Sequence, residues 1–183
     1  MIKIRAIEIV RKSDQTRREA EIAAVRQCLT SLGINEIPEH NDHGAPYLAG
    51  NPDVRISITH SKDWAAVAMG ETKDGLFGID IETINRPQLE KVAARVLSAM
   101  EITIAESLKH GLTKAWTAKE AIYKAVLDYK TDFRKDICLC APDFSMAEYK
   151  PTHRTLSLKY IEVGTTDLFC LASQCNNFEF ITL

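Results

Sequence analysis

The sequence predicts an α+β fold made of two similar halves, and three observations lead to that prediction. The chain has 183 residues, of which 45% are hydrophobic and 26% charged, as is usual for a globular protein with one sizeable core or two small ones. Short alternating runs predict strands, and longer runs with helical spacing predict helices. The order of strand, helix and antiparallel strands occurs twice, so we expect an N-terminal half over residues 1–75 and a C-terminal half over residues 76–183.

The N-terminal half is expected to begin with a strand and a helix. Residues 2–10 alternate apolar and polar side chains, which is typical of a strand. Residues 13–32 have helical spacing, and Thr16 and Glu19 have the spacing of a capping box. The expected apolar face of this helix comprises Ile22, Val25 and Leu29.

A loop and a hairpin are expected to complete this half. Residues 34–53 contain three prolines and two glycines, which favour a loop. The runs 54–59 and 64–69 flank a short polar turn and predict a β-hairpin.

The C-terminal half has the same order of elements. A strand is expected at 76–83, followed by helical segments at 88–100, 100–110 and 112–127. Further strands are expected at 137–140, 155–163, 167–173 and 177–182.

Charge and hydropathy exclude some classes of protein. The formal net charge is -2, which does not favour a nucleic-acid binder or a protein of anionic membrane surfaces. No apolar run approaches the ~18 residues of a membrane-spanning helix, and the N-terminal residues lack a signal-peptide layout. The five cysteines include no CxxC pair, so neither a disulfide framework nor a zinc site is expected. The expected location is the cytoplasm.

Two carboxylates interrupt the apolar run LFGIDIETIN at residues 76–85. In a strand, Asp80 and Glu82 share one face with Gly78, while the alternate positions form an apolar face. Like charges this close raise each other's pKa unless a cation or water lies between them. The face is therefore either a site for a cation or the solvated side of an ordinary strand.

A second pair of charged residues lies on the predicted helix at AWTAKEAIYKAV. Glu120 and Lys124 are one turn apart and lie away from the apolar stripe. That stripe comprises Ala115, Ala118, Ile122 and Val126. Such a pair is either part of a site or a favourable surface pair worth about 0.2–0.5 kcal/mol.

A third polar group lies where the predicted hairpin turns, in RISITHSKDW. Thr59, His60 and Ser61 together can hold a phosphate by hydrogen bonds. A plain polar turn would have the same composition, so this segment alone does not decide between the two interpretations.

Taken in order, ITHS, GIDIE and WTAKEAIYKA resemble the 4'-phosphopantetheinyl transferase superfamily. Gly78–Glu82 matches the family's G-[IV]-D-[IV]-E strand, and Trp116–Lys124 matches its W-x-x-K-E-x-x-x-K helix. Thr59–Ser61 matches the [ST]-H-S segment of the larger, surfactin-synthetase-activating subtype. In that subtype one chain carries two halves related by pseudo-two-fold symmetry, so the resemblance implies this fold and a monomer.

The resemblance implies a transferase, a holo-acyl-carrier-protein synthase. Such an enzyme moves 4'-phosphopantetheine from coenzyme A to a serine of an apo acyl or peptidyl carrier protein and releases 3',5'-ADP. It implies Mg²⁺ held by Asp80, Glu82 and Glu120, with Glu120 also acting as the base. Lys124 would neutralise charge on the diphosphate.

Coenzyme A would be bound by residues from both halves. The resemblance assigns the phosphates and the nucleotide to Arg18, Arg26, Thr59, His60, Lys119 and Lys124. The family often has G-K-P-Y before the hairpin, whereas this chain has Gly44-Ala45-Pro46-Tyr47. His43 is a candidate to replace the missing lysine.

Two alternatives stay open on the sequence alone. A non-catalytic relative that binds coenzyme A or a carrier protein would explain Ala45. An unrelated α+β interaction module would require the three motifs to be coincidental. The sequence does not name the carrier or its pathway.

Overall fold

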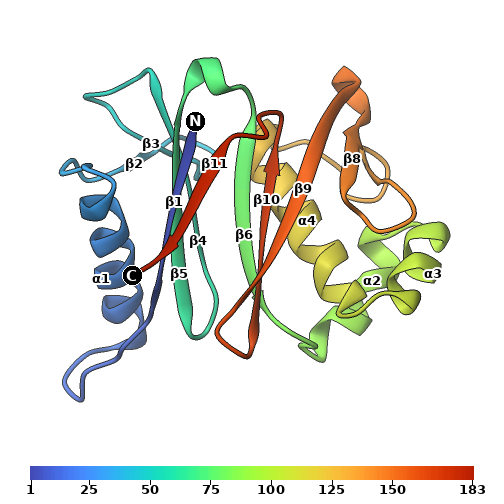
Figure 1. Cartoon of the computed structure of the whole chain (residues 1–183), viewed down its shortest axis with the longest axis horizontal. Coiled ribbons are helices and arrows are strands. Elements are labelled where there is room, and N and C mark those ends of the chain that lie inside the picture. Colours follow the sequence, from blue (N-terminus) through green and yellow to red (C-terminus); the bar gives the residue numbers. More distant parts are fainter.

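The computed structural model describes residues 1–183 and has four α-helices and two main β-sheets (Figure 1). The predicted α+β class is confirmed, whereas the pseudo-two-fold symmetry stays a prediction. No helix is both long and apolar enough to cross a bilayer.

The first sheet has the strand order β11-β1-β5-β4. Its strands are β1 (Ile2–Glu8), β4 (Val54–His60), β5 (Trp64–Glu71) and β11 (Phe178–Thr182). Helix α1 (Arg17–Ser31) packs against this sheet, and its predicted capping box between Thr16 and Glu19 is present (Figure 1). A short pair of strands, β2 (Glu39–His40) and β3 (Pro46–Tyr47), lies within the predicted loop.

The second sheet has the order β6-β10-β9-β8-β7. Its strands are β6 (Phe77–Thr83), β7 (Ile137–Leu139), β8 (Met146–Tyr149), β9 (Arg154–Val163) and β10 (Asp167–Ser173). The helices of this part are α2 (Gln88–Val96), α3 (Ala99–Ser107) and α4 (Gly111–Val126). Single 3₁₀ turns occur at Thr72–Asp74 and Lys150–Thr152.

Strands β4 and β6 are the facing edges of the two sheets, and side-chain hydroxyl groups join them. Ser57 Oγ accepts a hydrogen bond of 3.1 Å from the Ile79 amide, and Thr59 Oγ1 accepts one of 3.2 Å from the Ile81 amide. These bonds satisfy backbone donors that a neighbouring strand would otherwise pair. The seam between the sheets is therefore ordered by two side chains of β4.

Helix α4 packs directly on β6, and a glycine makes this possible. A Cβ atom added at Gly78 would overlap the backbone of Ala121 and lie 2.5 Å from the Ala125 amide nitrogen. The face that carries Gly78, Asp80 and Glu82 is therefore turned towards α4, as the alternation predicts. The opposite face, which includes Phe77, lies in an apolar core shared by strands of both sheets.

Two sequence expectations need correction. Ile22 is 54% exposed, and the buried side of α1 is formed by Ala20, Ala24, Cys28 and Leu29. The apolar face of that helix is therefore built largely from small residues that let it lie close to the sheet.

Residues 178–182 were expected with the C-terminal half, but β11 pairs in parallel with β1. The division of the chain at residue 75 stays a prediction.

Candidate functional site

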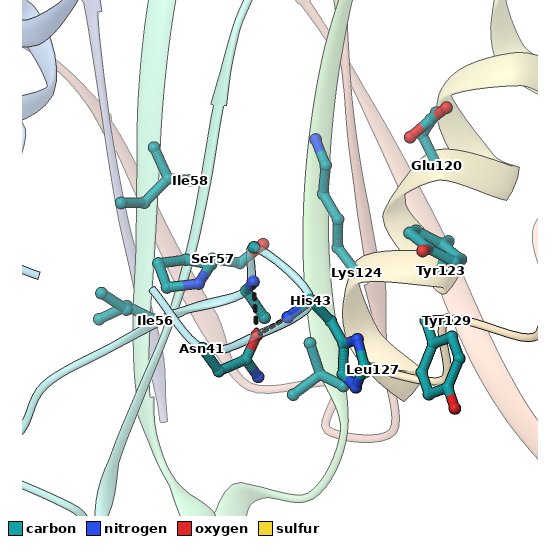
Figure 2. Close-up of a pocket in the computed structure, with 13 residues that line it drawn as sticks. Asn41, His43, Ile56, Ser57, Ile58, Glu120, Tyr123, Lys124, Leu127 and Tyr129 are labelled. Carbon is teal, nitrogen blue, oxygen red and sulfur yellow. Dashed lines mark hydrogen bonds between the residues drawn. The ribbon is translucent and has the colours of Figure 1, made fainter. Parts of the chain in front are cut away.

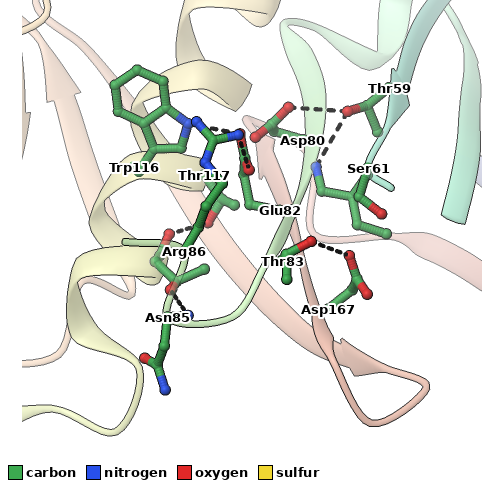
Figure 3. Close-up of polar contacts among 12 residues, drawn as sticks. Thr59, Ser61, Asp80, Glu82, Thr83, Asn85, Arg86, Trp116, Thr117 and Asp167 are labelled. Atoms are coloured by element: carbon green, nitrogen blue, oxygen red, sulfur yellow. Dashed lines mark hydrogen bonds and ion pairs between the residues drawn. The ribbon is translucent and has the colours of Figure 1, made fainter. Parts of the chain in front are cut away.

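Asp80 lies at the seam of the two sheets, where three groups meet. Lys124 Nζ donates a hydrogen bond of 2.7 Å to Asp80 Oδ1, and the Thr59 hydroxyl donates one of 3.0 Å to the same oxygen. Figure 3 shows Thr59 and Asp80 pointing towards one another from β4 and β6. Asp80 is 5% exposed, and its other oxygen, Oδ2, is buried without a hydrogen-bond partner.

Glu82 lies two residues further along the same face of β6. Trp116 Nε1 donates a bond of 2.9 Å to Oε1, and Arg86 Nη1 donates one of 3.1 Å to Oε2 (Figure 3). Burial raises the pKa of Glu82, and the nearby charge of Asp80 adds to this shift, while Arg86 and Trp116 oppose it. The Trp116 side chain thus holds one of the predicted metal ligands in place.

Glu120 projects from α4 beside the same carboxylates. Its pKa is raised to about 7, first because burial disfavours the charged form and then because Asp80 adds a negative charge nearby. Lys124 opposes this shift. A carboxyl group with such a pKa exchanges protons near neutral pH, as a general base must.

A cavity of about 220 Å³ opens beside Glu120 and Lys124 (Figure 2). Its lining comes from the 41–46 loop, from residues 56–58 of β4, and from the C-terminal end of α4 and the residues after it. The rings of His43 and Tyr129, which both line this cavity, stack with centroids 4.0 Å apart. Asn41 Oδ1 accepts hydrogen bonds of 3.0 Å from the amides of His43 and Ala45, which orders the loop. The segment that contains Ala45 therefore forms a wall of this cavity.

A larger cavity of about 720 Å³ lies between α1 and the end of β4. Arg18, Arg26 and His60 line it, together with apolar side chains that include Ile22. Ile58 lines both this cavity and the smaller one, so the two are neighbours. Three of the side chains predicted to bind coenzyme A are thus brought together, and the exposed Ile22 forms part of the same wall.

Two predicted binding residues have other roles in the structure. Lys119 is 0% exposed and forms an ion pair of 2.9 Å with Glu101. Its Nζ also donates to the carbonyl groups of Phe133 and Ile137, at 2.8 Å each. This side chain supports the packing of α4 against α3 and β7, and it cannot reach a nucleotide. Thr59 is 4% exposed and lines neither cavity, so its predicted phosphate contact is also not supported.

The predicted metal ligands lie near enough to shift one another's pKa, but they do not form a complete ligand set. No three His, Cys, Asp or Glu side chains lie close enough together to hold a metal ion. The donor chemistry nevertheless fits a hard cation: Asp80 Oδ2 is buried and unpaired, and the pKa values of Glu82 and Glu120 are raised by burial beside a second carboxylate. The assignment of Asp80, Glu82 and Glu120 to a divalent ion stays a prediction.

Two contacts at this site could not be predicted clearly from the sequence. Arg86 follows β6 by three residues and folds back onto Glu82. Tyr129 follows α4 and lines the smaller cavity, where its ring stacks on that of His43. A carboxylate four residues before an arginine, at the end of a predicted strand, was the only available signal for the first contact.

Residues 76–167 match a family model described as the 4'-phosphopantetheinyl transferase superfamily. This segment includes β6, α4 and all the carboxylates described above. A search of curated proteins finds no match to the chain.

Proposed function

The chain belongs to the 4'-phosphopantetheinyl transferase superfamily, and from this membership we propose that it transfers 4'-phosphopantetheine from coenzyme A to a serine of an apo acyl or peptidyl carrier protein. The membership itself implies a transferase that acts on phosphopantetheine. The donor, the carrier, the need for Mg²⁺ and the release of 3',5'-ADP are the proposed parts. We also propose the larger subtype with two pseudo-symmetric halves in one chain, acting as a cytoplasmic monomer.

One observation carries the proposal: β6 and α4 bring Asp80 and Glu82 together with Glu120 and Lys124, and the latter two line the smaller cavity. Three carboxylates and one ammonium group beside a cavity suit a reaction at a diphosphate, where negative charge grows on the leaving oxygens. Asp80, Glu82 and Glu120 would hold a divalent cation. When bound, such an ion supplies Lewis-acid stabilisation of the phosphate oxygens.

In the proposed reaction the serine hydroxyl oxygen forms a bond to the β-phosphorus of coenzyme A. The bond from this phosphorus to the bridging oxygen breaks, and that oxygen leaves with 3',5'-ADP. Glu120 takes the proton of the serine hydroxyl, which its pKa of about 7 allows. Lys124 would move from Asp80 to the diphosphate as charge develops there.

The remaining binding contacts are proposed from the larger cavity. Arg18, Arg26 and His60 would bind the phosphates of coenzyme A, since arginine offers forked donors that match phosphate oxygens. Neither Lys119 nor Thr59 is assigned to this task, because both are buried and bonded within the chain.

The mass of an intact carrier protein tests the proposal. Apo carriers from the same genome are incubated with the protein, coenzyme A and Mg²⁺, and each is expected to gain the mass of one phosphopantetheine if it is a substrate. A parallel reaction with Glu120→Gln is the matched control, because it removes the base without changing the size of the side chain. No mass gain on any carrier would overturn the proposal.

Ala45 favours a second candidate, a non-catalytic relative that binds coenzyme A or a carrier protein. Ala45 lines the smaller cavity where the family often has a lysine. This candidate predicts measurable coenzyme A binding without any mass gain on the carriers. Absence of both coenzyme A binding and mass gain would favour the third alternative, an unrelated α+β interaction module.

A further inference from the structure

The Thr59 hydroxyl group lies at the point where β4, β6 and α4 meet. It donates its one proton to Asp80 Oδ1 at 3.0 Å, and it accepts from the Ile81 amide at 3.2 Å and from Lys124 Nζ at 3.3 Å. One donated and two accepted bonds use the whole hydrogen-bonding capacity of a hydroxyl group. The Thr59 hydroxyl group therefore has no donor or acceptor left for a hydrogen bond to a ligand.

These bonds determine which oxygen of Asp80 remains available. Oδ1 accepts from both Thr59 and Lys124, whereas Oδ2 is buried and has no partner. The amide that Thr59 binds belongs to Ile81, the next residue along β6. The hydroxyl group thus holds both the side chain of Asp80 and the backbone beside it.

We infer that Thr59 is a positioning residue, which fixes Asp80 so that Oδ1 faces the chain's own donors and Oδ2 is presented to a divalent cation. The inference rests on the proposed function, because it assigns a purpose to the free oxygen. It replaces the expected phosphate contact of Thr59 with an indirect role. Outer partners that orient a metal-binding carboxylate typically change metal affinity by 10–100-fold when they are removed.

Ser57 provides the matched comparison within the same seam. It lies two residues before Thr59 on β4, is equally buried, and accepts from the Ile79 amide at 3.1 Å. Its hydroxyl group does not bond to Asp80 or to Lys124. A change at Ser57 therefore loosens the seam without releasing the carboxylate, which separates a structural effect from positioning.

The test compares Thr59→Val, Thr59→Ser and Ser57→Ala in the full chain. Valine keeps the shape of threonine but removes the hydroxyl group, and serine restores that group. Mn²⁺ is titrated by calorimetry into each protein without coenzyme A, because Ser57 lines the smaller cavity, and thermal unfolding is measured alongside. We expect Thr59→Val to weaken Mn²⁺ binding by about 10-fold or more, whereas Thr59→Ser stays within about 3-fold of the unmodified chain.

Ser57→Ala is expected to lower the melting temperature as Thr59→Val does, yet to keep the Mn²⁺ affinity of the unmodified chain. Two results would overturn the inference: an unchanged Mn²⁺ affinity in Thr59→Val, or an equal loss in Ser57→Ala. If Thr59→Val does not fold, Thr59→Cys takes its place, because a thiol has similar size and is a weak donor.

Steady-state kinetics give a second readout. Thr59 lines neither cavity, so Thr59→Val should lower kcat and leave the KM for coenzyme A within about 3-fold, whereas a phosphate contact would raise that KM. A raised KM with an unchanged kcat would overturn the inference. Failure of the proposed function would give a different result. The unmodified chain would then add no mass to any carrier, while Thr59→Val would still weaken Mn²⁺ binding.

Discussion

Gly78 of β6 and Ala121 of α4 lie so close that no side chain fits between them, because a Cβ atom at Gly78 would overlap the Ala121 carbonyl oxygen. This contact sets the distance between α4 and β6. It therefore also decides whether Glu120 and Lys124 reach the carboxylates of β6.

Gly78→Ala is expected to lower both stability and transfer activity. The added methyl group meets backbone atoms that cannot rotate away, so α4 must move, at a cost of about 1–3 kcal/mol or more. Urea unfolding and the carrier mass assay measure the two losses. Gly50→Ala is the control, since its methyl group would meet only the flexible Glu36 side chain. A fully active, fully stable Gly78→Ala protein would contradict this account of the packing.

Glu120→Gln should reduce transfer by about 10²–10⁴-fold or more, because the proposed base is lost together with one proposed ligand of the ion. The fold should remain intact, since glutamine has the same size and carries no charge to bury. Initial rates from intact carrier mass and a circular dichroism melt check the two expectations. Turnover equal to that of the unmodified chain would show that Glu120 is not the base.

The raised pKa of Glu120 predicts a pH dependence of stability in buffer that contains EDTA. A carboxyl group whose pKa rises from 4.5 to about 7 on folding binds its proton more tightly in the folded state. Its contribution to stability is therefore complete below pH 4.5 and is lost as the pH rises through about 7. The melting temperature of the unmodified chain, relative to that of Glu120→Gln, should fall between about pH 5 and pH 8. A difference that stays constant over this range would contradict the burial of the charge.

Ala45→Lys should increase the affinity for coenzyme A if the 41–46 loop lies near the 3'-phosphate of that ligand. The new ammonium group would enter the smaller cavity and add a charge-assisted hydrogen bond. Calorimetry with coenzyme A and with 3'-dephospho-coenzyme A checks this, because only the former should gain affinity. Equal behaviour of both ligands would place the phosphate elsewhere.

Lys119→Met should destabilise the fold while leaving coenzyme A affinity within about 2-fold. It removes the partner of the buried Glu101 carboxylate and two bonds to backbone carbonyl groups, and breaking a buried pair in this way typically costs about 3–5 kcal/mol. Chemical unfolding and ligand titration measure the two quantities. A large loss of affinity in a protein of unchanged stability would restore the predicted nucleotide contact.

Much of the candidate site could be predicted from local pattern. The alternation in β6 correctly places Asp80 and Glu82 on one face, and helical spacing correctly puts Glu120 and Lys124 on the side away from the core. The environment of Lys119 could not be predicted in this way. Its position next to Glu120 suggests a site residue, but its burial depends on α3 and β7, which approach from elsewhere in the chain.

The hydrogen bonds of Thr59 could not be predicted from the sequence either. Its bonds depend on the approach of β6 to β4 at the seam, and no local spacing predicts which strand edges face one another. The β2–β3 pair and β8 were missed because short strands carry too few residues to show alternation. Ile22 was misplaced because Ala20 and Ala24, together with Cys28 and Leu29, form the buried side of α1.

The parallel pairing of β1 with β11 has a consequence for synthesis of the protein. Residues 178–182 must leave the ribosome before β1 gains this neighbour, although β1 lies far upstream of them in the chain. Until then β1 presents an open edge, of the kind that can recruit a strand from another nascent chain. Slower translation of the codons for β11 should therefore increase aggregation of the nascent chain, although β11 itself is short.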